Sequence, residues 1–472
     1  MKVGVQYGEG WMELELPVEP IVIRYGTDRF PRIPLHPNPQ KAVEEALDNP
    51  IGGPSLDELI KRGGVKKVSI SFDDPTRVSQ VIQTALPIVI KRLKALGISK
   101  RDMILISANG AHNKWTRAEL RNHIGSAVFD EFCPPDATFS RVVNHDCTQD
   151  LVNLGESKYG DVVEYNKVLV ETDLHIHCGT ITPLAYGGYS GQGIVVGLMG
   201  IGAANSHHGA HVFMHPDACH GDPDPAKNIY RRHKLACHEK IEEATKNRIF
   251  YVDCIAVIGE GVVEAFAGYV PELEKVEYPR ADRYFKVKVR PADVLILGTP
   301  PRITYDSLDN PLVLSAYLLY PLRLARDRAL LKKDGVIIAP VKCKGVFSEK
   351  RPGDPKAYEL LGKYYDVEDL WFENIDAFWA NTEYLFKYRY EYAYAPWHCL
   401  WGATNPLRLK TLVREVILFG EIKPGIARYM GFTPAKSWKE AWKLACDIVG
   451  PDPQVTVLPA FWAEPRPVFV PE

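Results

Sequence analysis

Residues 65–112 read "VKKVSISFDDPTRVSQVIQTALPIVIKRLKALGISKRDMILISANGAH", and this stretch decides the fold. Residues 65–74 alternate apolar and polar side chains, which predicts a strand. Residues 76–97 carry apolar side chains at helical spacing and end on basic residues and Gly97, which predicts a helix. Residues 102–112 predict a second strand. Because a strand, a helix and a strand follow one another, we expect a parallel sheet covered by helices.

The second half of the chain repeats this order. Residues 248–268 predict two paired strands around a turn, and residues 291–301 predict a buried strand. Residues 311–340 predict a helix that stops at Gly335, followed by a strand. The proline- and charge-rich residues 270–285 predict the junction between the two units.

We therefore expect an α/β fold of two α/β domains with mainly parallel, helix-covered sheets. The N-terminal domain is expected at residues 1–275 and carries the motifs described below. The C-terminal domain is expected at residues 276–444. The tail, residues 445–472, predicts a helix and then a strand, and it is a candidate to return to the first domain.

Composition narrows the class of protein. The chain has 472 residues and a formal net charge of −2, so it lacks the excess of cations that a nucleic-acid or polybasic membrane partner requires. The 9 cysteines form no CxxC pair, which is typical of reduced thiols in the cytoplasm. We see no signal peptide, and the longest apolar run, Val195–Ala204, is too short to span a bilayer. The sequence does not predict an oligomeric state.

The motif "FDDPTR" (72–77) follows the first predicted strand, where ligands bind in open α/β sheets. Asp74 is suited to cap the next helix, and Thr76 with the helix N-terminus is suited to hold an anion. Arg77 is suited to grip a carboxylate through two hydrogen bonds. An Asx turn and N-cap beside a solvated arginine explains the same residues without a ligand.

The motif "NGAH" (109–112) follows the next predicted strand. A glycine turn after a strand places His112 at the rim of the sheet. A histidine there can act as a general base near neutral pH. The alternative is a histidine that only hydrogen-bonds within its loop.

Glycines and histidines are dense in "GGYSGQGIVVGLMGIGAANSHHGAH" (187–211), which lacks the Gly-Lys-Ser/Thr of a P-loop. The glycines permit close backbone approach to a ligand. His207, His208 and His211 can share a helical face, and imidazole suits Ni, Zn, Cu or Fe. Any one of these histidines is more often a surface or hydrogen-bonded residue, but the cluster favours at least one metal ligand.

Two further stretches carry weaker signals. In "HIHCG" (175–179), His175 and His177 share one face of a strand, and a core role is as consistent with this as a catalytic one. The aromatic stretch "FKYRYEYAYAPWHCLW" (386–401) indicates an interface, a substrate pocket or the edge of a core.

Taken in order, five motifs resemble the nickel-dependent lactate racemase family and its wider 2-hydroxyacid racemase and epimerase superfamily. They are "DDPTR" (73–77), "NGAH" (109–112), "NHDC" (144–147), "PLAYGGYSGQG" (183–193) and "NSHH" (205–208). The resemblance covers roughly residues 65–240, and the C-terminal half matches only in its α/β pattern.

The resemblance implies an isomerase with its active site in the cleft between two α/β domains. It also implies a nickel-pincer nucleotide, whose nickel is held by sulfur and carbon atoms. A histidine takes the hydroxyl proton of a small 2-hydroxy acid while C2 gives its hydride to the cofactor. The hydride then returns to the other face of the planar 2-keto acid.

Carried over by position, the resemblance gives His112 the role of acid/base and Arg77 that of holding the substrate carboxylate. His208 matches the nickel ligand, with His207 as the fallback. The expected cofactor-binding residues are Asp74, Thr76, Gly188, Ser190, Gly191 and Gly193.

The chain departs from the family pattern at two positions. Ile194 stands where the family has the lysine that tethers the cofactor, and Leu184 stands where it has a second catalytic histidine. We therefore expect the cofactor to be held noncovalently and expect His177 or Tyr186 to serve the other face. Tyr305 and Arg302 are the nearest in type to the tyrosine and lysine of the family's second domain.

Two other functions fit the same residues. One is a zinc-dependent hydrolase or lyase that uses the histidine cluster. The other is a non-catalytic relative that binds a nucleotide or carries the cofactor.

Overall fold

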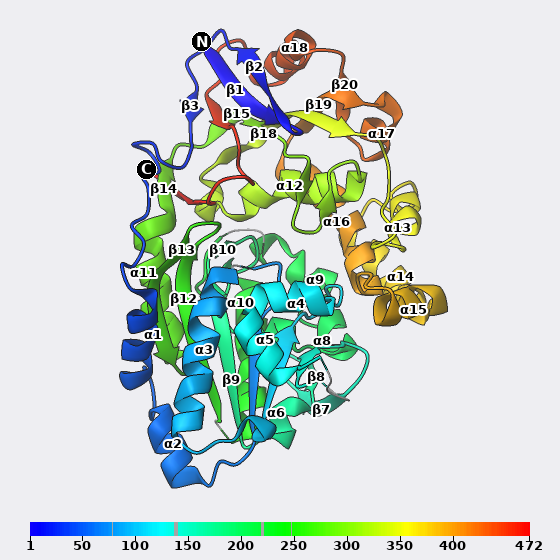
Figure 1. Cartoon of the computed structure of the whole chain (residues 1–472). Helices are drawn as coiled ribbons and strands as arrows, with labels where there is room; N and C mark the ends of the chain where they lie inside the picture. The colour runs from blue at the N-terminus through cyan, green and yellow to red at the C-terminus, as the bar shows by residue number, and fades with distance from the viewer. Residues whose placement is uncertain (78, 136–139, 219–220, 247) are drawn as a thin grey trace.

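Two six-stranded sheets organise the computed structural model, which describes residues 1–472 except 78, 136–139, 219–220 and 247 (Figure 1). The first sheet has the order β13-β12-β9-β4-β5-β6 and the second has the order β20-β19-β18-β15-β21-β3. We call each sheet with its helices the first and second α/β unit. The predicted fold class, α/β with two mainly parallel, helix-covered sheets, is confirmed.

The first sheet is parallel except at its edge, where β13 pairs antiparallel with β12. Its side chains alternate between two cores, one under α1, α3, α4 and α5 and one under α7, α10 and α11. The strands are β4 (Val68–Asp73), β5 (Met103–Ala108), β6 (Val142–Asn144), β9 (Leu174–Ile181), β12 (Ile249–Val257) and β13 (Gly261–Gly268). The helices of the first core are α1 (Pro39–Asp48), α2 (Leu56–Gly63), α3 (Ser79–Ala95), α4 (Arg117–Ile124) and α5 (Ser126–Phe132).

Apart from β9, the residues between β6 and β12 lie outside the first sheet and cover the face that carries α7 and α10. They begin with an antiparallel hairpin, and they include the glycine-rich turn and the histidine stretch. Their elements besides β9 are β7 (Leu151–Glu156), β8 (Val162–Asn166), α6 (Val168–Glu171), β10 (Pro183–Leu184), β11 (Gly188–Tyr189), α7 (Gly193–Gly197), α8 (Ile201–Asn205), α9 (Ala210–Phe213) and α10 (Ile229–Thr245).

The second sheet is parallel throughout. One face packs against α18 and the hairpin of β1 and β2, and the other faces the main core with α12 and α16. Its strands are β3 (Ile21–Val22), β15 (Ala292–Leu297), β18 (Leu331–Cys343), β19 (Glu415–Ile422), β20 (Thr433–Ala435) and β21 (Val455–Leu458). Separate two-stranded sheets pair β1 (Lys2–Tyr7) with β2 (Gly10–Glu15), β14 (Lys286–Val289) with β22 (Val468–Pro471), and β16 (Arg302–Ile303) with β17 (Asp306–Ser307). The helices are α12 (Pro311–Arg323), α13 (Asp354–Leu360), α14 (Val367–Ala380), α15 (Thr382–Tyr390), α16 (Pro396–Leu412), α17 (Pro424–Tyr429) and α18 (Trp438–Val449).

Local signals in the first unit are reproduced closely. A capping box opens α4: the Thr116 side chain accepts from the backbone N–H of Glu119, and the Glu119 side chain accepts from the backbone N–H of Thr116. Pro87 lies inside α3, whose buried face it does not interrupt.

Three expectations differ from the structure. The tail does not return to the first sheet, because β21 lies between β15 and β3 in the second sheet. The N-terminal domain does not include β1, β2 and β3, because they pack with the second sheet. Residues 270–285 contain α11 (Glu272–Phe285), the last helix that packs on the first unit, and β14 follows it directly. Gly335 lies within β18 rather than ending a helix. The helix before it, α12, already ends at Arg323, and Asp327 and Arg328 then reverse the chain at positive φ.

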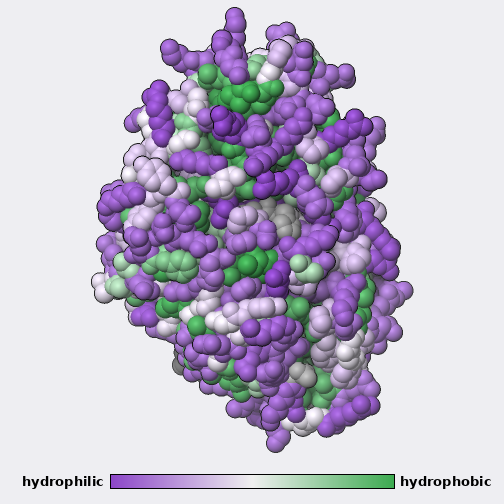
Figure 2. Space-filling view, turned by 180° about the vertical axis from the view of Figure 1, so that it is seen from behind, coloured by the Kyte–Doolittle hydropathy of each residue, from purple (hydrophilic) through white to green (hydrophobic). Residues whose placement is uncertain are grey.

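Neither the described helices nor the surface seen in Figure 2 shows a long apolar stretch. In the described part of the chain, no helix is both long and apolar enough to cross a bilayer. The face opposite to that of Figure 1 is largely hydrophilic, with hydrophobic residues in small groups (Figure 2). The cytoplasmic location stays a prediction from the free thiols.

Candidate active site

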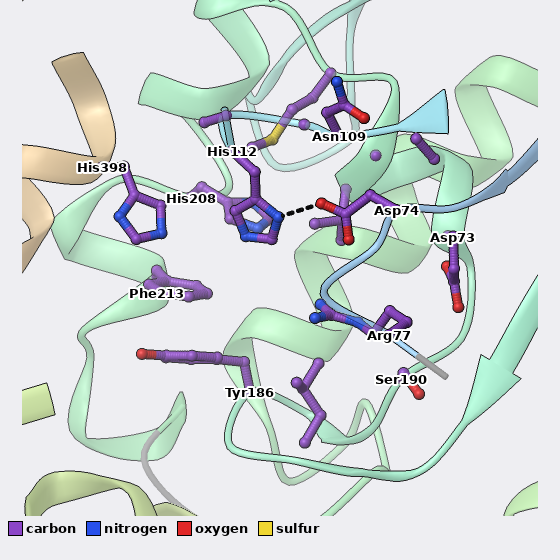
Figure 3. Close-up of a pocket in the computed structure, with 18 of the residues that line it drawn as sticks. Asp73, Asp74, Arg77, Asn109, His112, Tyr186, Ser190, His208, Phe213 and His398 are labelled. Carbon is purple, nitrogen blue, oxygen red and sulfur yellow. Dashed lines mark hydrogen bonds and ion pairs between the residues drawn. The ribbon is translucent and has the colours of Figure 1, made fainter. Parts of the chain in front are cut away.

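A cavity lies where the two α/β units meet (Figure 3). The first unit contributes the ends of β4 and β5, the glycine turn before α7, and residues from the histidine stretch and α10. The second unit contributes Tyr305 and the start of α16. The polar and aromatic side chains that line it include Asp73, Asp74, Arg77, Asn109, His112, Tyr186, Ser190, His208, Phe213, Tyr230, Lys234, Tyr305, Trp397, His398 and Trp401.

Asp74 and His112 form an oriented pair at the ends of two neighbouring parallel strands. Asp74 Oδ2 lies 2.8 Å from His112 Nδ1. Burial alone raises the pKa of Asp74, but His112 and Arg77 together hold it below its ordinary value, so the carboxyl is ionised. An ionised carboxylate only accepts hydrogen bonds, so Nδ1 carries the proton and Nε2 keeps a lone pair. The pair therefore presents a base to the cavity.

Arg77 is fixed by the turn between β4 and α3. Its Nη1 donates to Thr76 Oγ1 over 2.8 Å, and its backbone N–H donates to Asp74 O over 2.9 Å. The Thr76 hydroxyl and N–H both donate to Asp74 Oδ1. The Asx turn considered for this motif is therefore present. Yet Arg77 is half-buried and lines the cavity, so it is not a solvated surface residue.

The glycine turn meets the cavity with Ser190, Gly191 and Gly193, whereas Gly188 does not line it. A Cβ added at Gly188 would lie 2.6 Å from the carbonyl oxygen of Gly221, at a φ of 78°. A Cβ at Gly193 would collide with His177 Nε2. These glycines are therefore required by the packing of the chain against itself.

His177 lies beneath the glycine turn and does not line the cavity. It belongs to a buried chain of hydrogen bonds across β4 and β9. His177 Nδ1 lies 2.8 Å from Ser71 Oγ, which lies 2.8 Å from His175 Nε2; His175 Nδ1 lies 2.7 Å from Ser69 Oγ. Burial lowers the pKa of His175 to about 3, so this imidazole is neutral. The two histidines do share a strand face, and that face is internal.

The three candidate metal ligands separate in the structure. His208 lines the cavity, whereas His207 lies behind it, with Nδ1 of the two rings 2.6 Å apart. The His207 Nε2 faces the hydroxyl of Tyr165 at 3.0 Å. His211 packs against Phe372, away from this pair. Among the residues that the structure describes, no three His, Cys, Asp or Glu side chains are grouped to hold a metal ion.

His398 is a site residue that the sequence motifs missed. Its Nδ1 lies 2.8 Å from Arg351 Nη1, and guanidinium groups only donate, so Nδ1 accepts and Nε2 carries the proton. Burial and the charge of Arg351 hold the pKa of His398 well below its ordinary value, so the ring stays neutral. The aromatic stretch at 386–401 was the available signal, and Trp397 and Trp401 from it also line the cavity.

Lys234 is a second missed residue. It comes from α10, and its Nζ donates to the carbonyl oxygen of Gly191 in the glycine turn. Burial, reinforced by Arg231, lowers its pKa to about 7. A lysine 40 residues beyond the turn gave no motif, because only the packing of α10 brings it to the cavity.

Comparison with known proteins agrees with this architecture. Residues 7–221 match the family described as the lactate racemase N-terminal domain. The lactate racemase of Thermoanaerobacterium thermosaccharolyticum is 24% identical over 97% of both chains. The lactate racemase of Lactiplantibacillus plantarum is 32% identical over 39% of this chain and 41% of its own.

Solved structures show the same fold. The lactate racemase apoprotein from T. thermosaccharolyticum superposes over 100% of both chains with a TM-score of 0.72 and 22% identity. A protein from Thermotoga maritima, solved by structural genomics, gives a TM-score of 0.54 at 18% identity over 89% of this chain and 99% of its own. Fold and cleft define a two-unit α/β protein with a site between its units. Its first half matches the lactate racemase N-terminal domain, and the chain is similar along its length to a lactate racemase.

Proposed function

We propose that this chain is an isomerase of the lactate racemase type, a racemase or epimerase of a 2-hydroxy acid. The observation that carries the proposal is the meeting of Arg77, His112 and His398 in one cavity. A 2-hydroxy acid needs a clamp for its carboxylate, and a base and a hydrogen-bond donor for its C2 hydroxyl.

Each residue has a distinct task. The Arg77 guanidinium binds the substrate carboxylate, and the Thr76 hydroxyl holds the guanidinium in place. His112 Nε2 takes the proton of the C2 hydroxyl, and Asp74 stabilises the resulting imidazolium. The Nε2–H of His398 donates to the oxygen at C2 as its carbonyl character grows. Tyr305, Trp397 and Trp401 line the cavity and exclude water from it.

Three features of the site bear on whether the family's nickel-pincer nucleotide would fit it. Burial holds the pKa of His208 well below its ordinary value, so this imidazole is neutral, which is the form that ligates a metal. Ile194 is fully buried in the core, so it offers neither a tether nor space for one. Ser190, Gly191 and Lys234 lie on the same wall.

These residues fit a noncovalently held group. His208 would be its single protein ligand, and Lys234 with the turn at Ser190 would face its nucleotide part. When bound, the group would supply the acceptor and donor of the C2 hydride.

The site is asymmetric with respect to acid–base groups. Leu184 lines the cavity where the family has its second histidine, and His177 lies outside the cavity. Tyr186 lines it but stacks on Phe213 with ring centroids 3.8 Å apart. His398 donates and cannot accept while Arg351 holds it. We therefore infer a mechanism with one base, His112, for both hands of the substrate.

The test measures both the cofactor content of the protein and its turnover of substrate. The protein is produced together with the pincer-cofactor machinery, and nickel and nucleotide are measured by elemental analysis and native mass spectrometry. We expect about one nickel per chain, a nucleotide released on denaturation, and interconversion of the enantiomers of a 2-hydroxy acid. His208→Ala should lose the nickel. Binding without turnover would favour the carrier function.

The zinc hydrolase alternative has less support. Catalytic zinc sites use three protein ligands, and the described residues provide no such group. Zinc that copurifies with full occupancy and sustains hydrolysis would restore it.

A further inference from the structure

A second cavity adjoins the candidate active site. The two cavities share Arg77, Leu184 and Tyr305 as a common wall. Beyond that wall the second cavity is lined by Thr182, Thr304, Tyr320, Trp462 and Arg466. Arg77 therefore borders both spaces.

Arg466 is the second cation among the described residues that line this cavity. The guanidinium carbon lies 4.6 Å from the ring centroid of Trp462 and 5.5 Å from that of Tyr320. Its Nε is buried and has no hydrogen-bond partner. Across the described ranges, Arg466 lies within ion-pair distance of no carboxylate.

Two buried arginines of this unit, Arg351 and Arg326, show what Arg466 lacks. Arg351 Nε lies 2.6 Å from Asp354, and Arg326 Nη2 lies 2.7 Å from Asp282. A half-buried guanidinium usually finds such a partner, because desolvating a donor without an acceptor costs free energy. Arg466 instead faces a cavity.

The cavity is suited to an anion. Its lining, as far as the structure describes it, includes two arginines and no carboxylate. The hydroxyls of Thr182, Thr304 and Tyr320 supply further hydrogen-bonding groups at its wall. Planar, forked guanidinium groups match a carboxylate with two parallel hydrogen bonds.

We propose that the second cavity is a subsite for a distal acidic group, so that the substrate class is 2-hydroxy acids with a second carboxylate on the side chain. This inference rests on the proposed function. The C1 carboxylate binds Arg77, the C2 hydroxyl faces His112, and the chain passes Leu184 and Tyr305 to place the distal carboxylate on Arg466. A phosphate of a bound nucleotide has related chemistry and is the other source of an anion.

The first experiment measures binding, not turnover. The full-length, cofactor-free protein is titrated calorimetrically with 2-hydroxybutanoate and with 2-hydroxybutanedioate, which differ by a terminal methyl or carboxylate. We expect the diacid to bind about ten- to a hundredfold more tightly, the range for hydrogen bonds to a charged group. Equal affinity for the two acids would overturn the subsite.

Two variants locate the preference. Arg466→Gln should remove it by weakening diacid binding while leaving monoacid binding unchanged. Arg414→Gln is the matched control, because Arg414 is an exposed arginine of the same unit outside both cavities, and it should keep the preference. A preference that survives Arg466→Gln contradicts the proposal.

A folding defect and the other anion source give different results. If Arg466→Gln lowers the melting temperature, Arg466→Lys is compared with it. Because Arg466→Lys keeps the positive charge, it should retain part of the diacid preference. If both variants lose the diacid preference equally, the assignment is overturned. If Arg466→Gln lowers the nucleotide content of cofactor-loaded protein but not the diacid preference, the cavity holds the phosphate and the substrate class is wrong. If the diacid binds through Arg466 and no hydroxy acid is inverted, the subsite stands and the racemase function fails.

Discussion

His112 and His398 face the same cavity from different α/β units, with ring centroids 5.5 Å apart and planes inclined by 63°. Their partners fix opposite protonation patterns. Asp74 makes His112 a base at Nε2, and Arg351 makes His398 a donor at Nε2. Figure 3 shows His112 between Asp74 and His398. In the proposed mechanism, His112 is therefore the base and His398 the hydrogen-bond donor.

His112→Ala should lower kcat by about 10²–10⁴-fold, the contribution of a positioned general base. Cofactor-loaded protein would be assayed by chiral chromatography in both directions. Nickel content serves as the control, because His112 is not expected to ligate. Turnover that persists at the level of the unchanged protein would remove His112 from the mechanism.

Arg77→Lys should lower kcat/KM by about ten- to a hundredfold, since an ammonium cannot reproduce the forked hydrogen bonds to a carboxylate. The loss should appear for every 2-hydroxy acid tested, with or without a second acidic group. Arg290→Lys is the control, because Arg290 is exposed and pairs with Glu472. Unaltered kinetics in Arg77→Lys would contradict the clamp.

Arg351→Met should destabilise the protein by about 3–5 kcal/mol, because it leaves the carboxylate of Asp354 buried without its partner. The double variant Arg351→Met with Asp354→Leu should recover much of that free energy of unfolding. Denaturant titration measures both. The double variant should still lose activity, since it lacks the Arg351 contact that fixes the proton of His398 on Nε2. Full activity in it would show that the position of this proton is unimportant.

Lys234 should make stability rise with pH. Its pKa falls from 10.5 unfolded to about 7 folded, so between these values the unfolded state binds more protons, and stability increases as pH rises through that window. Below about pH 7 the full cost of burying the charge applies, on the order of 5 kcal/mol. The free energy of unfolding of the protein relative to Lys234→Met should therefore increase from pH 7 to 10. A constant difference would mean that Lys234 keeps its ordinary pKa in the fold.

The part of the fold that follows from sequence is the part set by local pattern. The spacing of apolar residues over 68–108 predicts β4, α3 and β5, and Thr116 with Glu119 marks the start of α4. A two-residue strand such as β3 has no period, so its place in the second sheet could not be predicted. The sequence of α11 is rich in charged residues and contains Pro279, so it did not predict a helix; its buried apolar residues nevertheless pack onto the first unit.

The same distinction applies to the site. Asp74, Arg77 and His112 stand at the ends of adjacent strands, so sequence order alone brings them together in a parallel sheet. His398 reaches the cavity only through the packing of α16, and Lys234 only through that of α10. Their tautomer and pKa depend on Arg351 and on burial, which no local motif encodes.

The order of strands in the second sheet has a consequence for biosynthesis. The first sheet is complete once residue 268 has left the ribosome, whereas the second needs β3 near the start of the chain and β21 at 455–458. During translation the first unit can fold early, while β3 waits unpaired for a neighbour made almost at the end. The wall of the cavity that holds His398 and Tyr305 is therefore the last to assemble, and a chain truncated before β21 would carry the base without its closed site.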